Sequence, residues 1–93
     1  MKLCVQYMAQ LRPLVGRNDD QVDLPEGCNV ASLLALLATA QPAAAAHLLT
    51  AAGQMRPSLL VALNGAAVSV SEAATIVLRE GDVVTLLPPI AGG

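Results

Sequence analysis

The most informative part of the sequence is residues 83–93, which read VVTLLPPIAGG. The first five residues form a β-branched and leucine run of the kind found in a central strand. Two prolines follow and hold the chain extended as it leaves the strand, because they cannot begin a helix there. The last residues are small, as chain ends often are. Six residues after the strand span up to about 20 Å when extended. The pattern predicts a central strand and an extended exit from it, and it makes the tail a candidate for a carboxylate presented into a partner's narrow channel.

The rest of the sequence predicts a sheet with helices grouped in its middle. Alternating residues indicate a strand over 2–8, and the other expected strands cover residues 21–24, 59–63 and 66–70. Asn64-Gly65 joins the last two as a hairpin, because both residues tolerate a positive φ. A helical turn is expected over 11–15.

Two longer helices are expected between Val30 and Ala52, separated at Gln41–Pro42. Asn29 is the predicted N-cap of the first helix, and Gly53 is the predicted stop of the second. Apolar residues recur at i, i+3, i+4 and i+7 in both helices, at Val30, Leu33, Leu34, Leu37 and at Ala45, Leu48, Leu49, Ala52. The order of elements predicts an α+β fold in which the helices cover one face of a mostly hairpin-linked sheet.

Composition and charge exclude several classes of protein. The chain has 93 residues, enough for one domain, and a net charge of −2 with no Phe or Trp. No cationic stripe or stacking platform is present, so we expect no nucleic-acid partner. No signal peptide is evident, and the uncharged stretch from Val30 to Ala52 contains Gln41, Pro42 and His47, so we expect no membrane segment and a cytoplasmic protein.

Few residues of the sequence are suited to catalysis or metal binding. The single histidine, His47, lies in an alanine-rich helix, and Cys4 and Cys28 are far apart in the sequence. These residues cannot supply a zinc site, and no base is placed beside a nucleophile. Asp19-Asp20 is expected to be a solvated turn. We therefore expect no bound metal or cofactor and no catalysis by this chain alone.

The sequence resembles the ubiquitin-like sulfur carriers, and most closely the small subunits of molybdopterin synthase. The matching stretches, in the family's order, are residues 9–16 (AQLRPLVG), 29–34 (NVASLL), 61–65 (VALNG) and 80–93 (EGDVVTLLPPIAGG). The resemblance implies a β-grasp fold, with a mixed sheet in a domain of residues 1–87 and a free tail of residues 88–93. The family often has an acidic residue at the position of Pro13 and an aromatic residue near Leu86–Leu87.

The resemblance also implies a mechanism. A separate activating enzyme uses ATP and Mg²⁺ to adenylate the C-terminal glycine, here Gly93, and a sulfur donor converts the adenylate into a thiocarboxylate. The large subunit of the synthase, in an expected heterotetramer, receives the tail and directs the sulfur onto a pyranopterin precursor. Gly92 would keep the tail slim enough for the channel.

The carrier must also dock on its partners. Apolar residues on the sheet face that the helices leave open are the natural candidates. The expected contacts are Met8, Val68 and Leu87, with Arg12 at the rim and Pro88 and Ile90 in the tail. Three alternatives remain open: a sulfur carrier for thiamine or cysteine synthesis, a ubiquitin-like protein modifier, and a β-grasp interaction module with an idle tail.

Overall fold

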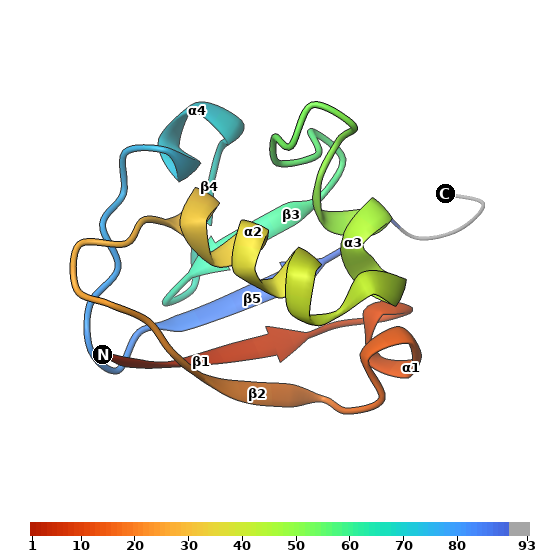
Figure 1. The fold of residues 1–93 in the computed structure, drawn as a ribbon, viewed down its shortest axis with the longest axis horizontal. Helices are drawn as coiled ribbons and strands as arrows, with labels where there is room; N and C mark the ends of the chain where they lie inside the picture. Colours follow the sequence, from red (N-terminus) through yellow and green to blue (C-terminus); the bar gives the residue numbers. More distant parts are fainter. Residues whose placement is uncertain (90–93) are drawn as a thin grey trace.

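The computed structural model describes residues 1–89 and consists of one five-stranded sheet with helices on one side (Figure 1). The strands are β1 (Lys2–Tyr7), β2 (Asp19–Asp23), β3 (Leu60–Leu63), β4 (Ala66–Val68) and β5 (Val83–Leu87). The helices are α1 (Leu11–Val15), α2 (Val30–Ala40), α3 (Pro42–Leu48) and α4 (Val70–Ala73).

The strand order is β2-β1-β5-β3-β4, so β5 lies at the centre of the sheet as its sequence predicts. It pairs with β1 in parallel and with β3 in antiparallel fashion, while the two hairpins β1–β2 and β3–β4 are antiparallel. This mixed topology, with the last strand in the middle, is the β-grasp arrangement. Asn64 and Gly65 have φ values of 50° and 87° at the predicted hairpin turn.

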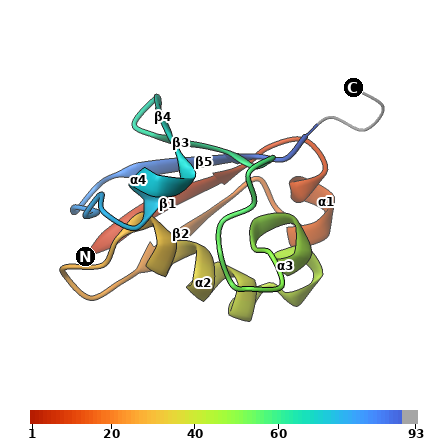
Figure 2. The same cartoon turned by 90° about the horizontal axis from the view of Figure 1, so that it is seen from above.

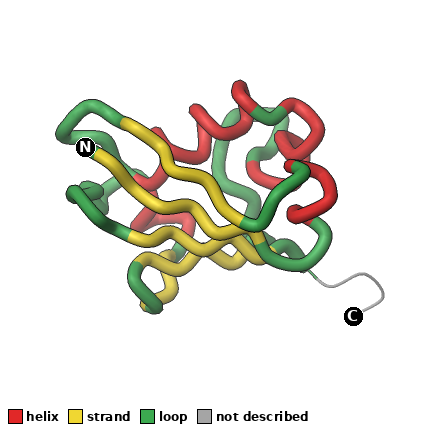
Figure 3. Tube along the Cα trace, turned by 90° about the horizontal axis from the view of Figure 1, so that it is seen from below, coloured by secondary structure: helices red, strands yellow, loops and turns green. Residues whose placement is uncertain are grey.

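Helices α2 and α3 cover a single face of the sheet, as Figures 2 and 3 show from opposite sides. The Asn29 side chain accepts a hydrogen bond from the Ser32 amide, 2.8 Å away, and so caps α2 as predicted. The stripe predicted for α2 is confirmed, because its four residues, Val30, Leu33, Leu34 and Leu37, are all buried. They belong to one core cluster with the alternate strand residues that face the helices, namely Leu3, Val5, Val61, Val84 and Leu86.

Helix α3 is shorter than the sequence predicts. It ends at Leu48, because Leu49 is extended (φ −124°, ψ 150°) and pairs with Met55 in an isolated β-bridge. This bridge brings Met55 into the core, where its side chain is 6% exposed. The stabilisation gained by this pairing and burial outweighs the helix propensity of the alanines that follow Leu49. Ala52 is consequently exposed, and Gly53 lies in a later turn rather than at the end of the helix.

A short helix, α4, begins at Val70, where a strand over 66–70 was expected, and extends into the predicted connection 71–80. Ser69 and Glu72 form a capping box, in which each side chain accepts a hydrogen bond from the other residue's backbone amide. This box begins α4, and Ala73 of the helix is buried in the core. Ile76 and Leu78 then turn inward as predicted.

Candidate functional site

The end of β5 is the part of the structure that leads to the predicted reactive tail. Beyond Leu87, Pro88 is buried and Pro89 is exposed, and Pro89 is the last residue described. The predicted site residues Ile90, Gly92 and Gly93 lie outside the described residues. The site is therefore built from the surface around Pro88 and Pro89.

The segment from Met8 to Arg12, which we call the exit turn, lies directly beside the end of β5. The Met8 amide donates a hydrogen bond to the Leu86 carbonyl over 3.0 Å, and continues the pairing of β1 with β5 by one residue. The Gln10 side chain donates from Nε2 to the Pro89 carbonyl over 2.6 Å. These two bonds connect the exit turn to the strand on both sides of Pro88.

The Arg12 side chain contacts Tyr7 and Met8 at the start of the exit turn. Its Nε donates to the Tyr7 carbonyl over 2.9 Å, and its Nη2 lies 3.6 Å from the Met8 sulfur. The Arg12 side chain remains exposed and borders a cavity of about 290 Å³ whose other lining residues are Gln6, Tyr7, Met8, Asn18 and Asp19. Arg12 therefore places a positive charge beside the tail exit without a carboxylate partner among the described residues.

The sheet face opposite the helices, which we call the open face, carries apolar side chains close to the exit. Leu60 is 51% exposed and lies directly opposite half-buried Leu87 in the β3–β5 register. Alternation along the strands places these further residues on the same face: Cys4, Gln6, Ala62, Ala67, Val83 and Thr85. The same register places the charged residues Lys2, Asp19 and Asp23 on this face at its β2 edge, so the apolar part lies over β5, β3 and β4. A partly apolar surface of this kind is typical of a protein–protein contact.

Three of the predicted partner residues come together here, and two do not lie where they were expected. Met8, Arg12 and Leu87 gather at the exit turn and the adjoining open face. The placement of Val68 on the open face is wrong, because it pairs with Val61 in register, both side chains face the helices, and Val68 is only 5% exposed. Pro88 is buried, so Pro89 is the accessible proline.

Two residues of this surface, Leu60 and Gln10, are absent from the sequence-based prediction. Leu60 belongs to an unbroken apolar run over 59–63, in which periodicity does not separate a covered face from an open one. Gln10 contacts a residue 79 positions away, and no local pattern signals that contact.

A second polar network joins β1 to β2 near the exit turn. The Tyr7 hydroxyl donates to Asp20 Oδ2 over 2.9 Å, and Arg17 Nε donates to Asp20 Oδ1. Burial, together with the Asp20 carboxylate, raises the pKa of Tyr7 above its ordinary value. The hydrogen bond from Arg17 is the main cause that lowers the pKa of Asp20. Tyr7 is therefore a neutral donor that ties two strands together, and its role is structural.

The other candidate reactive groups lie on three different segments: Cys4 on β1, Cys28 just before α2, and His47 on α3. Cys4 and Cys28 are free thiols, and His47 is half-buried on α3. Within residues 1–89, no three His, Cys, Asp or Glu side chains gather closely enough to hold a metal ion. No helix in the same part of the chain is long and apolar enough to cross a membrane.

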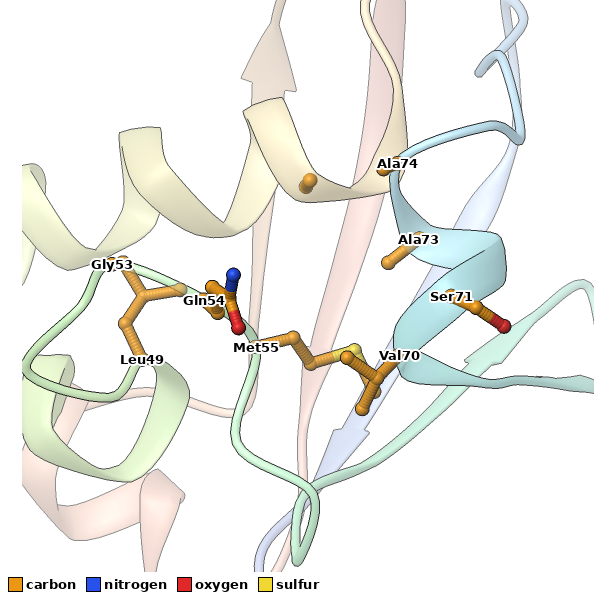
Figure 4. A pocket seen from close by; sticks show the side chains of 9 residues that line it. Leu49, Gly53, Gln54, Met55, Val70, Ser71, Ala73 and Ala74 are labelled. Carbon is orange, nitrogen blue, oxygen red and sulfur yellow. The ribbon is translucent and has the colours of Figure 1, made fainter.

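One apolar cavity lies away from the exit, between α2, α4 and the loop that follows α3 (Figure 4). It measures about 320 Å³ and is lined mainly by small and aliphatic residues, including Leu49, Met55 and Val70. None of its lining residues belongs to the exit turn or to the open face.

The topology, with a central last strand that leads into a tail, defines a ubiquitin-like β-grasp protein. The chain belongs to the ThiS family of ubiquitin-like sulfur carriers, whose profile matches residues 5–93. A relative from Chlamydomonas reinhardtii, named molybdopterin synthase sulfur carrier subunit, is 30% identical over 93 residues, which is all of both chains.

Solved structures of similar proteins agree with this assignment. SAMP1 from Haloferax volcanii, a small archaeal modifier protein, is 27% identical with a TM-score of 0.86 over 100% of both chains. A putative molybdopterin converting factor subunit 1 from Pyrococcus furiosus is also 27% identical, with a TM-score of 0.77 over 97% of this chain and 99% of that one. The predicted β-grasp fold and the resemblance to sulfur carriers are confirmed.

Proposed function

We propose that this chain is the sulfur-carrier subunit of a molybdopterin synthase and that Gly93 carries the sulfur as a thiocarboxylate. The observation that carries the proposal is the full-length similarity to a molybdopterin synthase sulfur carrier subunit. The sequence supports it, because Pro88-Pro89 directly follows the central strand and Gly92-Gly93 comes two residues later.

The proposed chemistry requires activation, because a C-terminal carboxylate has a pKa near 3.5 and is a poor acyl donor as an anion. In a separate enzyme, a carboxylate oxygen of Gly93 attacks the α-phosphorus of ATP, and pyrophosphate leaves. Hydrosulfide then attacks the carbonyl carbon of the acyl-adenylate, the carbon–oxygen bond to AMP breaks, and a thiocarboxylate and a proton result. This chain supplies the carbonyl carbon and its presentation, and the activating enzyme holds ATP and Mg²⁺.

The proposed partner is the synthase's large subunit, in a heterotetramer, and the docking surface is the open face together with the exit turn. Leu60 and Leu87 offer exposed apolar area, and Arg12 adds a charge at the rim. Exposed apolar residues beside a charged rim match the anatomy of protein interfaces. The two parts adjoin the strand that leads to Gly93, so one docking event brings surface and tail to the partner together.

The first test is the intact mass of the chain after incubation with a sulfur-carrier activating enzyme, ATP–Mg²⁺ and a sulfide source. We expect a gain equal to the exchange of one oxygen for one sulfur, and its loss on deletion of Gly93. Addition of a large subunit and the pyranopterin precursor should then return the original mass. No gain, beside a control carrier that reacts, would overturn the proposal.

Substitutions of Gly92 and Gly93 test whether the tail must lack side chains to enter the partner's channel. A β-carbon at either terminal glycine should obstruct a narrow channel, so Gly93→Ala and Gly92→Val should lower sulfur transfer by at least about ten-fold, the effect of a barrier increase near 1.4 kcal/mol. The unfolding midpoint should not change. Turnover of either variant at the normal rate would contradict the threading argument.

A second candidate function is protein modification, because SAMP1 is a modifier and shares the fold over the whole chain. In that case Gly93 would form an isopeptide bond with a target lysine. A mass increase on lysine-containing targets, with no sulfur retained on this chain, would favour modification over sulfur carriage.

A further inference from the structure

Gln10 stands at the N-cap position of α1 but does not cap the helix. Its backbone is already helical (φ −69°, ψ −9°), and its side chain makes no capping hydrogen bond. Glutamine is also outside the group of short polar residues favoured at this position. The side chain reaches instead to the Pro89 carbonyl, 79 residues away in sequence, over 2.6 Å. Helix formation therefore does not account for this residue.

The backbone directly before Gln10, within the same turn, is also strained. Ala9 has a φ of 50°, in the left-handed region that residues other than glycine rarely occupy. The strained residue lies between Met8, whose amide is bonded to β5, and Arg12, whose side chain is bonded to the Tyr7 carbonyl. Strain of this kind persists where surrounding bonds fix it, and it concentrates at functional sites.

The partner of Gln10 lies where the chain leaves the fold. Pro88 is buried directly after the central strand β5, and the proline rings at 88 and 89 restrict both φ angles. The remaining freedom at this point is largely the rotation that turns the Pro89 carbonyl. A single donor to that carbonyl is enough to select one orientation.

We infer that Gln10 is a positioning residue, which holds the Pro89 carbonyl and so sets the point and direction from which the last four residues leave the fold. This inference rests on the proposed function, because it concerns the presentation of Gly93. Four residues extend to at most about 14 Å, so the direction of departure decides which partner surface they reach. Fixing it beforehand lowers the entropy cost of entry into a channel.

The first arm of the test uses the isolated chain and needs no enzyme. Gln10→Glu keeps the size of the side chain but removes the N–H donor, while Gln10→Arg restores a donor. Gln54→Glu makes the same change in an exposed glutamine of the loop after α3, outside the exit turn. We expect Gln10→Glu to shift the ¹³C resonance of the Pro89 carbonyl, Gln10→Arg to shift it less, and Gln54→Glu to leave it in place.

The second arm measures steady-state thiocarboxylation by the activating enzyme as a function of carrier concentration. The net worth of an ordinary hydrogen bond corresponds to about a five-fold change in population. Gln10→Glu should therefore raise KM about five-fold and leave kcat within two-fold, because the chemical step on Gly93 is unchanged. Gln10→Arg should recover most of the loss, and Gln54→Glu should match the wild type.

The outcomes separate the inference from the proposed function. A Pro89 carbonyl resonance that does not respond to Gln10→Glu would overturn the inference, whatever the enzyme assay gives. A shifted resonance with an unchanged KM would also overturn it, because the bond would then exist without positioning the tail. If the wild-type chain gains no sulfur, the proposed function fails, and the carbonyl resonance still decides whether Gln10 holds the exit.

Discussion

The two faces of the sheet are built from alternate residues of the same strands, yet they differ in almost every physical respect. On the helix-covered face, Val84 and Leu86 of β5 are fully buried. On the open face, Leu87 is half-buried and its register partner Leu60 is 51% exposed. The apolar side chains of the covered face are buried within the chain, whereas those of the open face remain partly exposed to solvent. The difference separates residues that hold the fold from residues available to a partner.

The largest effect should come from equal truncations on the two faces. Leu86→Ala removes a fully buried side chain and should lower the free energy of unfolding by about 3 kcal/mol, within the range for buried leucines. Leu87→Ala should cost less than about 1 kcal/mol, because its side chain is only partly removed from water. Urea unfolding of both variants measures the difference. Equal losses would show that the open face is also part of the core.

A charge on the open face should weaken binding to a partner much more than it lowers folding stability. Leu60→Asp should weaken the complex with the large subunit at least about ten-fold, since a buried interface position does not tolerate an unpaired charge. The free energy of unfolding of the Leu60→Asp variant should change little. Val77→Asp is the matched control, because Val77 is 54% exposed but lies on the connection before β5. Similar affinities for the two variants would remove Leu60 from the docking surface.

The smallest effect is expected from loss of the hydrogen bond between the Tyr7 hydroxyl and Asp20, a polar contact on the covered side of the sheet. Tyr7→Phe should cost about 1 kcal/mol, the net value of one hydrogen bond. The pKa of folded Asp20 lies below its unfolded value near 3.8, so its stabilisation is present above about pH 4 and is lost as the pH falls further. Urea midpoints between pH 6 and pH 3 should fall in the wild type and fall less in Tyr7→Phe, which lacks one contribution to that pKa. Parallel profiles would contradict this assignment.

Local chemistry explains which parts of the fold the sequence predicts well. The run 83–87, the Asn29 cap and the Asn64-Gly65 hairpin each depend on a few adjacent residues, and the structure confirms all three. The capping box from Ser69 to Glu72 is equally local, so the spacing of these two residues would have allowed a prediction of α4, which the sequence analysis misses.

The errors arise where distant residues compete with local preference. Helix α3 ends early because Leu49 pairs with Met55, and Val68 faces the core because Val61 lies opposite it. The same limit applies to the site. Met8 and Leu87 are predicted from the alternation of side chains along their strands, with Arg12 at the rim, whereas the contact between Gln10 and Pro89 depends on the folded geometry alone.

The parallel pairing of β1 and β5 has a further consequence for the chain's own amines. The sequence contains one lysine, Lys2, whose carbonyl accepts a hydrogen bond from the Gly81 amide at the beginning of β5. Tyr7, five residues after Lys2 in β1, pairs with Leu86, which precedes Pro89 by three residues. These eight residues of extended chain span about 26 Å, while the four residues after Pro89 reach no more than about 14 Å. The N-terminal amine lies beside Lys2 and is bonded to the Leu24 carbonyl. If the tail carries an acyl group as proposed, its extended length is too short for that group to reach Lys2, and a label or surface attached through Lys2 leaves the opposite end of the chain free.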